Sequence, residues 1–146
     1  KTIGVNRVYD LNSLLDISDI VSIHVPLNKT TKNFINEKFI KNMRKGSALI
    51  NTARGGLLKN TKIIFDALAS NKLSNVFLDV LPSEPPLLNG ELINAWLKNN
   101  NIVKDKLIIN PHTSYFSKES FIEMRTKAAK NALSIIKNKI PLNIIK

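Results

Sequence analysis

Short apolar runs rich in β-branched residues alternate along the chain with longer segments in which apolar residues recur every three or four positions. The short runs are typical of buried parallel strands and occupy residues 19–25, 47–51, 75–80 and 107–110. The amphipathic segments predict helices over residues 36–43, 60–71, 92–98 and, as a long final helix, 117–136, and residues 11–15 are expected to form one short helical turn. Because strands alternate with helices, the pattern predicts an α/β fold with right-handed crossovers and a parallel sheet that has helices on both faces.

Single residues mark several ends of these elements. Pro26 stops the first strand, and Gly46 is expected to close the helix before the second strand in the manner of a C-cap. Ser117 is a suitable N-cap for the long helix. The residues after 139 are expected to form a tail that leaves this helix.

The composition indicates one globular domain. The chain has 146 residues, of which 43% are hydrophobic, and it contains no cysteine and two histidines. Disulfides and thiolate metal sites are therefore excluded, and we predict no metal site of another kind. No apolar run approaches the roughly 20 residues of a membrane span, and no signal peptide opens the chain, so the cytoplasm is the expected compartment.

The net charge of +11 would by itself suggest a nucleic-acid or membrane partner. However, 18 of the 22 basic residues are lysines, and they are scattered through the chain. Asparagine and isoleucine are also abundant, as expected of an AT-rich genome. Since no basic stripe is interleaved with aromatic residues, nucleic-acid binding is not expected.

The second predicted strand ends in a polar corner, Asn51-Thr52-Ala53-Arg54-Gly55-Gly56. A buried parallel strand often ends in this way where its carboxyl end opens onto a ligand crevice. The glycines allow close approach of a ligand to the backbone, and Arg54 offers a planar fork that suits a carboxylate or phosphate. The alternative is a strand-to-helix turn with a surface arginine, and the corner alone does not decide between the two.

Arg54, Glu84 and His112 follow three successive predicted strands. We expect them at one edge of the sheet, where parallel strands end. A glutamate bonded to imidazole stabilises the protonated ring and makes it a better proton carrier near neutrality, while an arginine can hold a carboxylate and polarise an adjacent carbonyl. Carbonyl reduction needs such a donor and anchor, with a hydride from elsewhere. His24, near the end of the first strand, is another candidate ligand group, although a histidine there is more often bonded to the backbone.

Motif residues along nearly the whole chain resemble those of the D-isomer-specific 2-hydroxyacid dehydrogenases, in the order and spacing of that family. These residues are His24-Val25-Pro26-Leu27, Thr31, Asn36, Met43, Gly46, Asn51-Thr52-Ala53-Arg54-Gly55-Gly56, Ala67-Leu68, Leu78-Asp79-Val80, Glu84-Pro85 and Pro111-His112. The segment from Pro111 to Ser117 is most similar to the branch of C-terminal-binding proteins, which are dehydrogenase-like transcriptional corepressors with enzyme-type bacterial relatives.

The resemblance implies the second half of a doubly wound, Rossmann-type NAD-binding domain and hydride transfer between NAD(H) and a small 2-keto or D-2-hydroxy acid. Arg54 would bind the substrate carboxylate and keto oxygen, His112 would donate a proton to the keto group, and Glu84 would hold His112. The residues that would line the NAD site are Val25, Pro26, Thr31, Thr52, Ala53, Arg54, Asp79, His112 and Tyr115. Asp79 would face the nicotinamide carboxamide, and the family also implies a homodimer.

The chain departs from the family because it lacks the glycine-rich phosphate loop, the acidic ribose-binding residue and most of the substrate domain. We therefore expect residues 1–146 to be a partial NAD-binding domain that is inactive alone, with a tail from about residue 139 returning toward the substrate domain. NADP remains an alternative to NAD. The alternatives to the enzyme are a non-catalytic, dinucleotide-sensing protein of corepressor type and an inactive truncated remnant.

Overall fold

The computed structural model describes residues 4–142 and 144, which belong to two compact units. The first unit extends to His112 and contains a parallel sheet with its helices. The second begins at Thr113 and contains a long helix.

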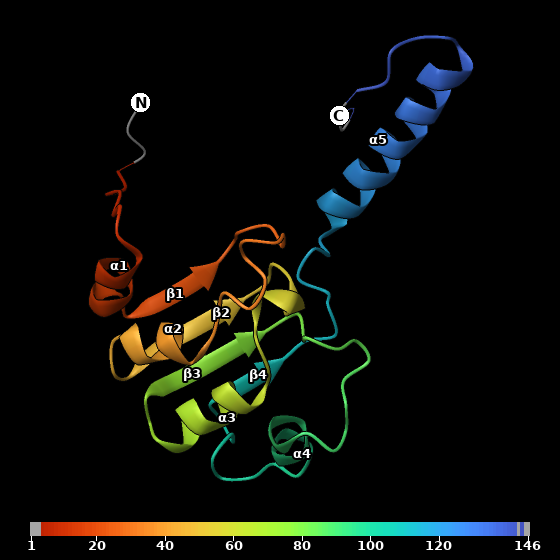
Figure 1. Cartoon of the computed structure of the whole chain (residues 1–146). Coiled ribbons are helices and arrows are strands. Elements are labelled where there is room, and N and C mark those ends of the chain that lie inside the picture. The colour runs from red at the N-terminus through yellow and green to blue at the C-terminus, as the bar shows by residue number, and fades with distance from the viewer. Residues whose placement is uncertain (1–3, 143, 145–146) are drawn as a thin grey trace. The chain divides into compact units, whose positions relative to one another are not determined.

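One four-stranded sheet forms the centre of the first unit (Figure 1). Its strands are β1 (Ile20–Ile23), β2 (Ser47–Asn51), β3 (Leu73–Leu78) and β4 (Leu107–Ile109), in that spatial order and all parallel. The four predicted strands are confirmed. The limits of three strands differ from the prediction: β1 spans Ile20–Ile23 rather than 19–25, β3 spans Leu73–Leu78 rather than 75–80, and β4 ends at Ile109 rather than at residue 110.

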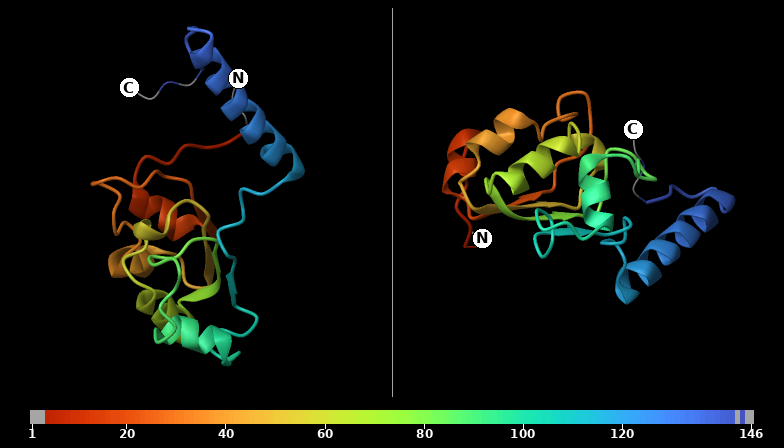
Figure 2. Two further views of the ribbon diagram at one scale, coloured as in Figure 1. Left: turned by 90° about the vertical axis from the view of Figure 1, so that its right-hand side faces the viewer. Right: turned by 90° about the horizontal axis from the view of Figure 1, so that it is seen from below.

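Four helices form one layer against this sheet. They are α1 (Leu11–Ile17), α2 (Glu37–Asn42), α3 (Lys62–Ala69) and α4 (Glu91–Leu97). Figure 2 shows all four on the same face. The reason is topological: the strands follow one another across the sheet in chain order, and successive right-handed crossovers in one direction place their helices on one side. The Rossmann-type sheet is therefore confirmed, but helices on both faces are not found among the described residues of the first unit.

Side chains that point toward the helix layer form the core. Leu49 and Val76, which are partners in the register of β2 and β3, are fully buried, and Leu107 beside them is 6% exposed. On the opposite face Ile20 is 63% exposed and Ile108 is 51% exposed. Successive side chains of a strand point to opposite faces, so this alternation follows from a sheet with one covered face.

The ends of α2 differ in part from the prediction. Asn36 caps the helix by accepting the N–H of Phe39 at 3.0 Å. Gly46 does not cap its C-terminus, because the helix already closes at Met43, whose N–H bonds back into the last turn. Gly46 instead has a φ of 80° in the turn that enters β2. A glycine adopts this left-handed conformation without the steric cost that a Cβ would bring.

The second unit contains α5 (Lys118–Ile136), the long helix predicted from the sequence. Ser117 and Ser120 form a reciprocal capping box at its N-terminus. The N–H of Leu142 donates to the side chain of Asn131 at 3.0 Å, so the described part of the tail folds back along α5. Residues 143, 145 and 146 of the predicted tail lie outside the described residues, and its approach to a substrate domain stays a prediction. No helix in the described ranges is long and apolar enough to cross a bilayer.

Candidate active site

The loops that follow the four strands carry the predicted site residues of the first unit. The strands run the same way, as their arrowheads show in Figure 1, so these loops emerge at one edge of the sheet. The structure gathers the residues into two groups, one around Arg54 and one around His112.

Asn51 fixes the backbone of the arginine corner, residues 51–56. Its side chain is fully buried at the end of β2. Its Oδ1 accepts the N–H of Ala53 at 3.1 Å, and its Nδ2 donates to the carbonyl of Arg54 at 3.2 Å. The 3₁₀ turn η1 (Gly55–Leu57) follows directly. Sequence reasoning assigned no role to Asn51, although a polar residue in the buried register of a strand is a signal that could have pointed to one.

The Arg54 side chain is exposed beside this fixed backbone. Its Nη1 donates to the carbonyl of Ala53 at 2.7 Å. In the described part of the chain, this is the only hydrogen bond that the Arg54 guanidinium donates, although the group carries five N–H donors. The remaining donors can therefore face an anionic ligand at the strand ends.

Arg54 lines a hollow of about 570 Å³, named the arginine hollow below, at the ends of β1 and β2. Four residues predicted for the cofactor site meet there. The lining consists of His24, Val25, Pro26, Leu27, Ala53 and Arg54. Two further predicted residues, Thr52 and Thr31, do not line it. Thr52 is half-buried next to Asn51, and Thr31 is hydrogen-bonded to the backbone of the loop after β1.

Thr31 acts on the loop through two hydrogen bonds. Its hydroxyl donates to the carbonyl of Pro26 at 2.6 Å and accepts the N–H of Asn28 at 2.9 Å. Nε2 of His24 lies 2.8 Å from the hydroxyl of Ser22. His24 is therefore bonded to a side chain rather than to the backbone, which corrects the expectation from the sequence.

Glu84 and His112 form the second group. Nδ1 of His112 lies 2.9 Å from Oε2 of Glu84, so the expected pairing is present. The other carboxylate oxygen, Oε1, accepts the N–H of Leu81 at 3.0 Å. These hydrogen bonds, that of His112 first and that of Leu81 second, hold the pKa of Glu84 below its ordinary value. The carboxylate is thus ionised at neutral pH and can orient the imidazole.

A second hollow, of about 440 Å³, adjoins this pair and is named the histidine hollow below. Asp79, which is 4% exposed, lies in its wall together with Glu84 and His112. The rest of the wall is largely apolar and includes Trp96 from α4. The N–H of Asp79 donates to the carbonyl of Asn51 at 3.0 Å, so the backbone joins the two groups at the end of the sheet.

The backbone of His112 has a φ of 56°, in the left-handed region that non-glycine residues rarely adopt. Such a conformation costs on the order of 1–3 kcal/mol and is found preferentially at functional sites. The sequence offered no glycine to signal it. Asparagine and aspartate residues outside both hollows have a similar φ, so this backbone conformation orients His112 but does not by itself mark a functional site.

Tyr115, the last predicted cofactor residue, lies in the second unit. Its ring packs edge-on against Phe116, with 6.4 Å between the ring centroids. Its contribution to a cofactor site stays a prediction.

The residues at these strand ends fit part of a dinucleotide. The arginine hollow falls within the range of about 300–1,000 Å³ that is usual for ligand pockets. Val25, Pro26 and Ala53 give its wall an apolar part, while His24 adds a polar group and Arg54 a positive charge. The chain has no GxGxxG sequence, so the backbone cradle usual for a pyrophosphate is not among its motifs. In the described ranges no group of three or more acidic or histidine side chains could hold a metal ion.

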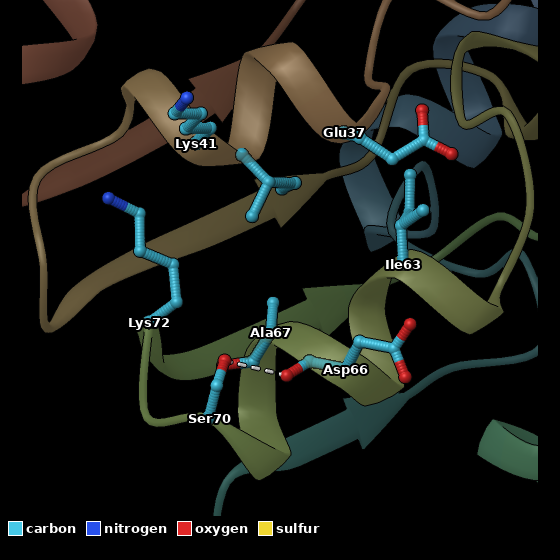
Figure 3. A pocket seen from close by; sticks show the side chains of 8 residues that line it. Glu37, Lys41, Ile63, Asp66, Ala67, Ser70 and Lys72 are labelled. Carbon is cyan, nitrogen blue, oxygen red and sulfur yellow. Dashed lines mark hydrogen bonds between the residues drawn. The ribbon is translucent and has the colours of Figure 1, made fainter.

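A further hollow of about 330 Å³ lies between α2 and α3 (Figure 3). Both of its carboxylates and its one hydroxyl are already paired: Glu37 binds Lys59 at 3.0 Å, Asp66 binds Lys62 at 2.8 Å, and the hydroxyl of Ser70 donates to the carbonyl of Asp66. It lies among helices rather than at the strand ends. We therefore do not assign it to the site.

The two groups together can perform one kind of chemistry. An exposed guanidinium can bind a carboxylate, and an imidazole held at Nδ1 by a carboxylate can donate a proton from Nε2. No covalent nucleophile is needed. The arrangement suits the reduction of a carbonyl that carries a neighbouring carboxylate.

Comparison with known proteins gives the same answer. Residues 1–114 match the family model described as the NAD-binding domain of D-isomer-specific 2-hydroxyacid dehydrogenases. A glycerate dehydrogenase of Methylorubrum extorquens is 34% identical over 136 residues, which cover 93% of this chain and 40% of that protein. A glyoxylate reductase of Thermofilum pendens is 36% identical over 132 residues, covering 90% of this chain and 36% of that protein.

Among solved structures, the D-lactate dehydrogenase of Lactobacillus jensenii with NAD+ superposes with a TM-score of 0.79. The match is 28% identical and covers 94% of this chain and 42% of that one. This chain thus spans about two fifths of the length of the curated relatives that it matches.

Proposed function

This chain belongs to the family of D-isomer-specific 2-hydroxyacid dehydrogenases, and we propose that it supplies the proton donor and the carboxylate anchor of such an enzyme. The enzyme would transfer a hydride between NAD(H) and a small 2-keto or D-2-hydroxy acid. The observation that carries the proposal is the Glu84–His112 pair, at 2.9 Å, on the same sheet edge as Arg54.

Arg54, His112 and Glu84 have different roles in keto-acid reduction. The guanidinium of Arg54 binds the substrate carboxylate and polarises the keto oxygen. Nε2 of His112 donates its proton to that oxygen, while Glu84 at Nδ1 holds the ring in position. Bound NADH supplies the hydride that C2 receives. One hydride and one proton convert the ketone to the alcohol, and the reverse direction uses the neutral imidazole as base.

The cofactor would lie along the arginine hollow and reach the histidine hollow. Val25, Pro26 and Ala53 would form the wall, with Thr31 and Thr52 supporting their loops. Asp79 would accept the carboxamide N–H of the nicotinamide, and for Tyr115 the assignment to the cofactor rests on the family resemblance alone. These assignments rest on the family resemblance together with the gathering of the first-unit residues at one edge.

The proposal is tested with the complete polypeptide that contains this chain. The names of the relatives suggest glyoxylate with NADH, and glycerate or D-lactate with NAD+, each repeated with the NADP form. Arg54→Ala and His112→Ala should each lower kcat/KM by about 10²–10⁴-fold. Arg44→Ala is the matched control, because Arg44 binds Asp19 outside both hollows. Unchanged turnover in the two site variants would refute the catalytic assignment.

Other properties are proposed at the level of the family. We expect a homodimer and a cytoplasmic location, as for a soluble dehydrogenase. Light scattering of the complete polypeptide would test the homodimer. The dehydrogenase and reductase relatives do not favour the non-catalytic, corepressor-type alternative. Tight NADH binding without turnover of any 2-keto acid would revive that alternative.

A further inference from the structure

The loops that carry the two groups of site residues touch at Gly55 and Leu81. A Cβ atom added at Gly55 would lie 1.8 Å from the carbonyl oxygen of Leu81 and 2.3 Å from its carbonyl carbon. These are backbone atoms of a buried residue, which cannot rotate away as a flexible side chain can. The conformation of Gly55 is not left-handed, so lack of space, rather than backbone freedom, is what requires a glycine there.

Leu81 also holds the catalytic carboxylate. Its N–H donates to Oε1 of Glu84 at 3.0 Å, and Oε2 of the same carboxylate lies 2.9 Å from Nδ1 of His112. The carbonyl of Leu81 therefore lies against Gly55, while its N–H is bonded to the carboxylate of Glu84. A shift of Leu81 would move the carboxylate that orients the imidazole.

We propose that Gly55 is a positioning residue: because it has no side chain, Leu81 can lie where its N–H fixes the Glu84 carboxylate against His112. Gly55 directly follows Arg54, so the same contact sets the separation between the carboxylate anchor and the proton donor. The proposal rests on the function proposed above. It concerns how the two halves of the site are held in register, and it assigns no contact of Gly55 with substrate.

A matched control stands next to Gly55 in the chain. A Cβ at Gly56 would come within 2.9 Å of Leu27, but only of Cδ2 at the end of a flexible side chain. Gly56→Ala therefore tests the general effect of an alanine in η1, whereas Gly55→Ala tests the contact with Leu81. A merely structural glycine would lower stability in Gly55→Ala without changing the ionisation of Glu84.

The experiment follows the Glu84 carboxyl carbon and the amides of Leu81 and Gly55 by NMR during pH titration of the labelled chain. In the wild type both amides should shift as Glu84 ionises, and Glu84→Gln should abolish these shifts. Gly55→Ala should uncouple Leu81 from Glu84 and raise the pKa of Glu84 toward its ordinary value, while Gly56→Ala should leave both unchanged. The charged and titratable groups that bear on Glu84 are His112 and Asp79.

In the complete polypeptide, Gly55→Ala should lower kcat by about 100-fold, as expected for a displacement of about 1 Å at a catalytic group. Wild-type coupling between Glu84 and Leu81 that persists in folded Gly55→Ala would overturn the proposal. If that variant does not fold, the wild type alone decides. The proposal is then overturned if the amide resonances of Gly55 and Leu81 do not shift as Glu84 ionises. Failure of the proposed function looks different, because the wild type would then reduce no 2-keto acid while the NMR coupling remained.

Discussion

The arginine corner depends on Asn51, a buried side chain with two backbone partners. We predict that Asn51→Ala lowers the free energy of unfolding by about 1–3 kcal/mol, because the N–H of Ala53 and the carbonyl of Arg54 lose their partner. It should also raise KM for the 2-keto acid, since Arg54 is no longer fixed. Urea unfolding and steady-state kinetics measure the two effects.

Asn42→Ala is the control for this prediction. The Asn42 side chain donates to Asn12 at 2.6 Å on the protein surface, so its loss should change stability by about 0.5 kcal/mol or less. Equal destabilisation in the two variants would show that Asn51 has no special part in holding the corner.

The lowered pKa of Glu84 makes a prediction about stability and pH. A carboxyl whose pKa is lower in the folded chain than in the unfolded chain stabilises the fold at pH values above its ordinary pKa, which is 4.5 for a glutamate. This stabilisation is lost as the pH falls through the lowered pKa of the folded chain. The difference in unfolding free energy between wild type and Glu84→Gln should therefore shrink as pH falls from about 5 to about 3.

Urea unfolding over a pH series measures this difference. The control is Glu119→Gln, an isosteric change in the first turn of α5 and outside the site. A Glu84 difference that stays constant over the whole range would show that the bonds to His112 and Leu81 do not favour the ionised form.

At the level of single residues, spacing and motif were sufficient to predict that Glu84 and His112 pair. They were not sufficient for Asn51, Leu81 or the left-handed backbone of His112. Each of these depends on where a peptide group lies after the chain has folded, and the amino-acid types alone carry little of that information.

The secondary-structure elements were more predictable than their exact limits. Period and β-branching identified all four strands, because burial in a parallel sheet demands apolar runs. The turn η1 and the place of Gly46 were missed, since short turns depend on individual hydrogen bonds. The strand order decides which face of the sheet the helices cover, and local sequence patterns do not reveal the strand order.

The single covered face predicts unequal effects of two similar substitutions. Leu49→Ala should cost about 2–5 kcal/mol, because this β2 side chain is fully buried beneath the helices. Ile108→Ala should cost about 1 kcal/mol or less, because its side chain lies half-exposed on the other face of β4. Chemical unfolding of both variants measures the difference. A larger loss for Ile108→Ala would mean that this face is packed in solution.

At the scale of the whole molecule, the fold was predictable from the sequence, whereas the site is formed by segments that lie far apart in the chain. The sheet brings Arg54 and His112 to one edge although 58 positions separate them (112 − 54) in the chain. Family resemblance was needed to give these residues their roles, because the same fold hosts many reactions. The similarity to the C-terminal-binding-protein branch, the tail and the role of Tyr115 stay predictions.

The central claim is hydride transfer to a 2-keto acid at the site of Arg54 and His112. Its most direct test uses the complete polypeptide containing this chain, NADH with deuterium at both hydrogens of C4, and mass spectrometry of the product. We predict one deuterium at C2 of a 2-hydroxy acid of D configuration, with transfer reduced by about 10²-fold or more in His112→Ala. Bound NADH with no deuterium transferred to any 2-keto acid, or undiminished transfer in His112→Ala, would contradict the account.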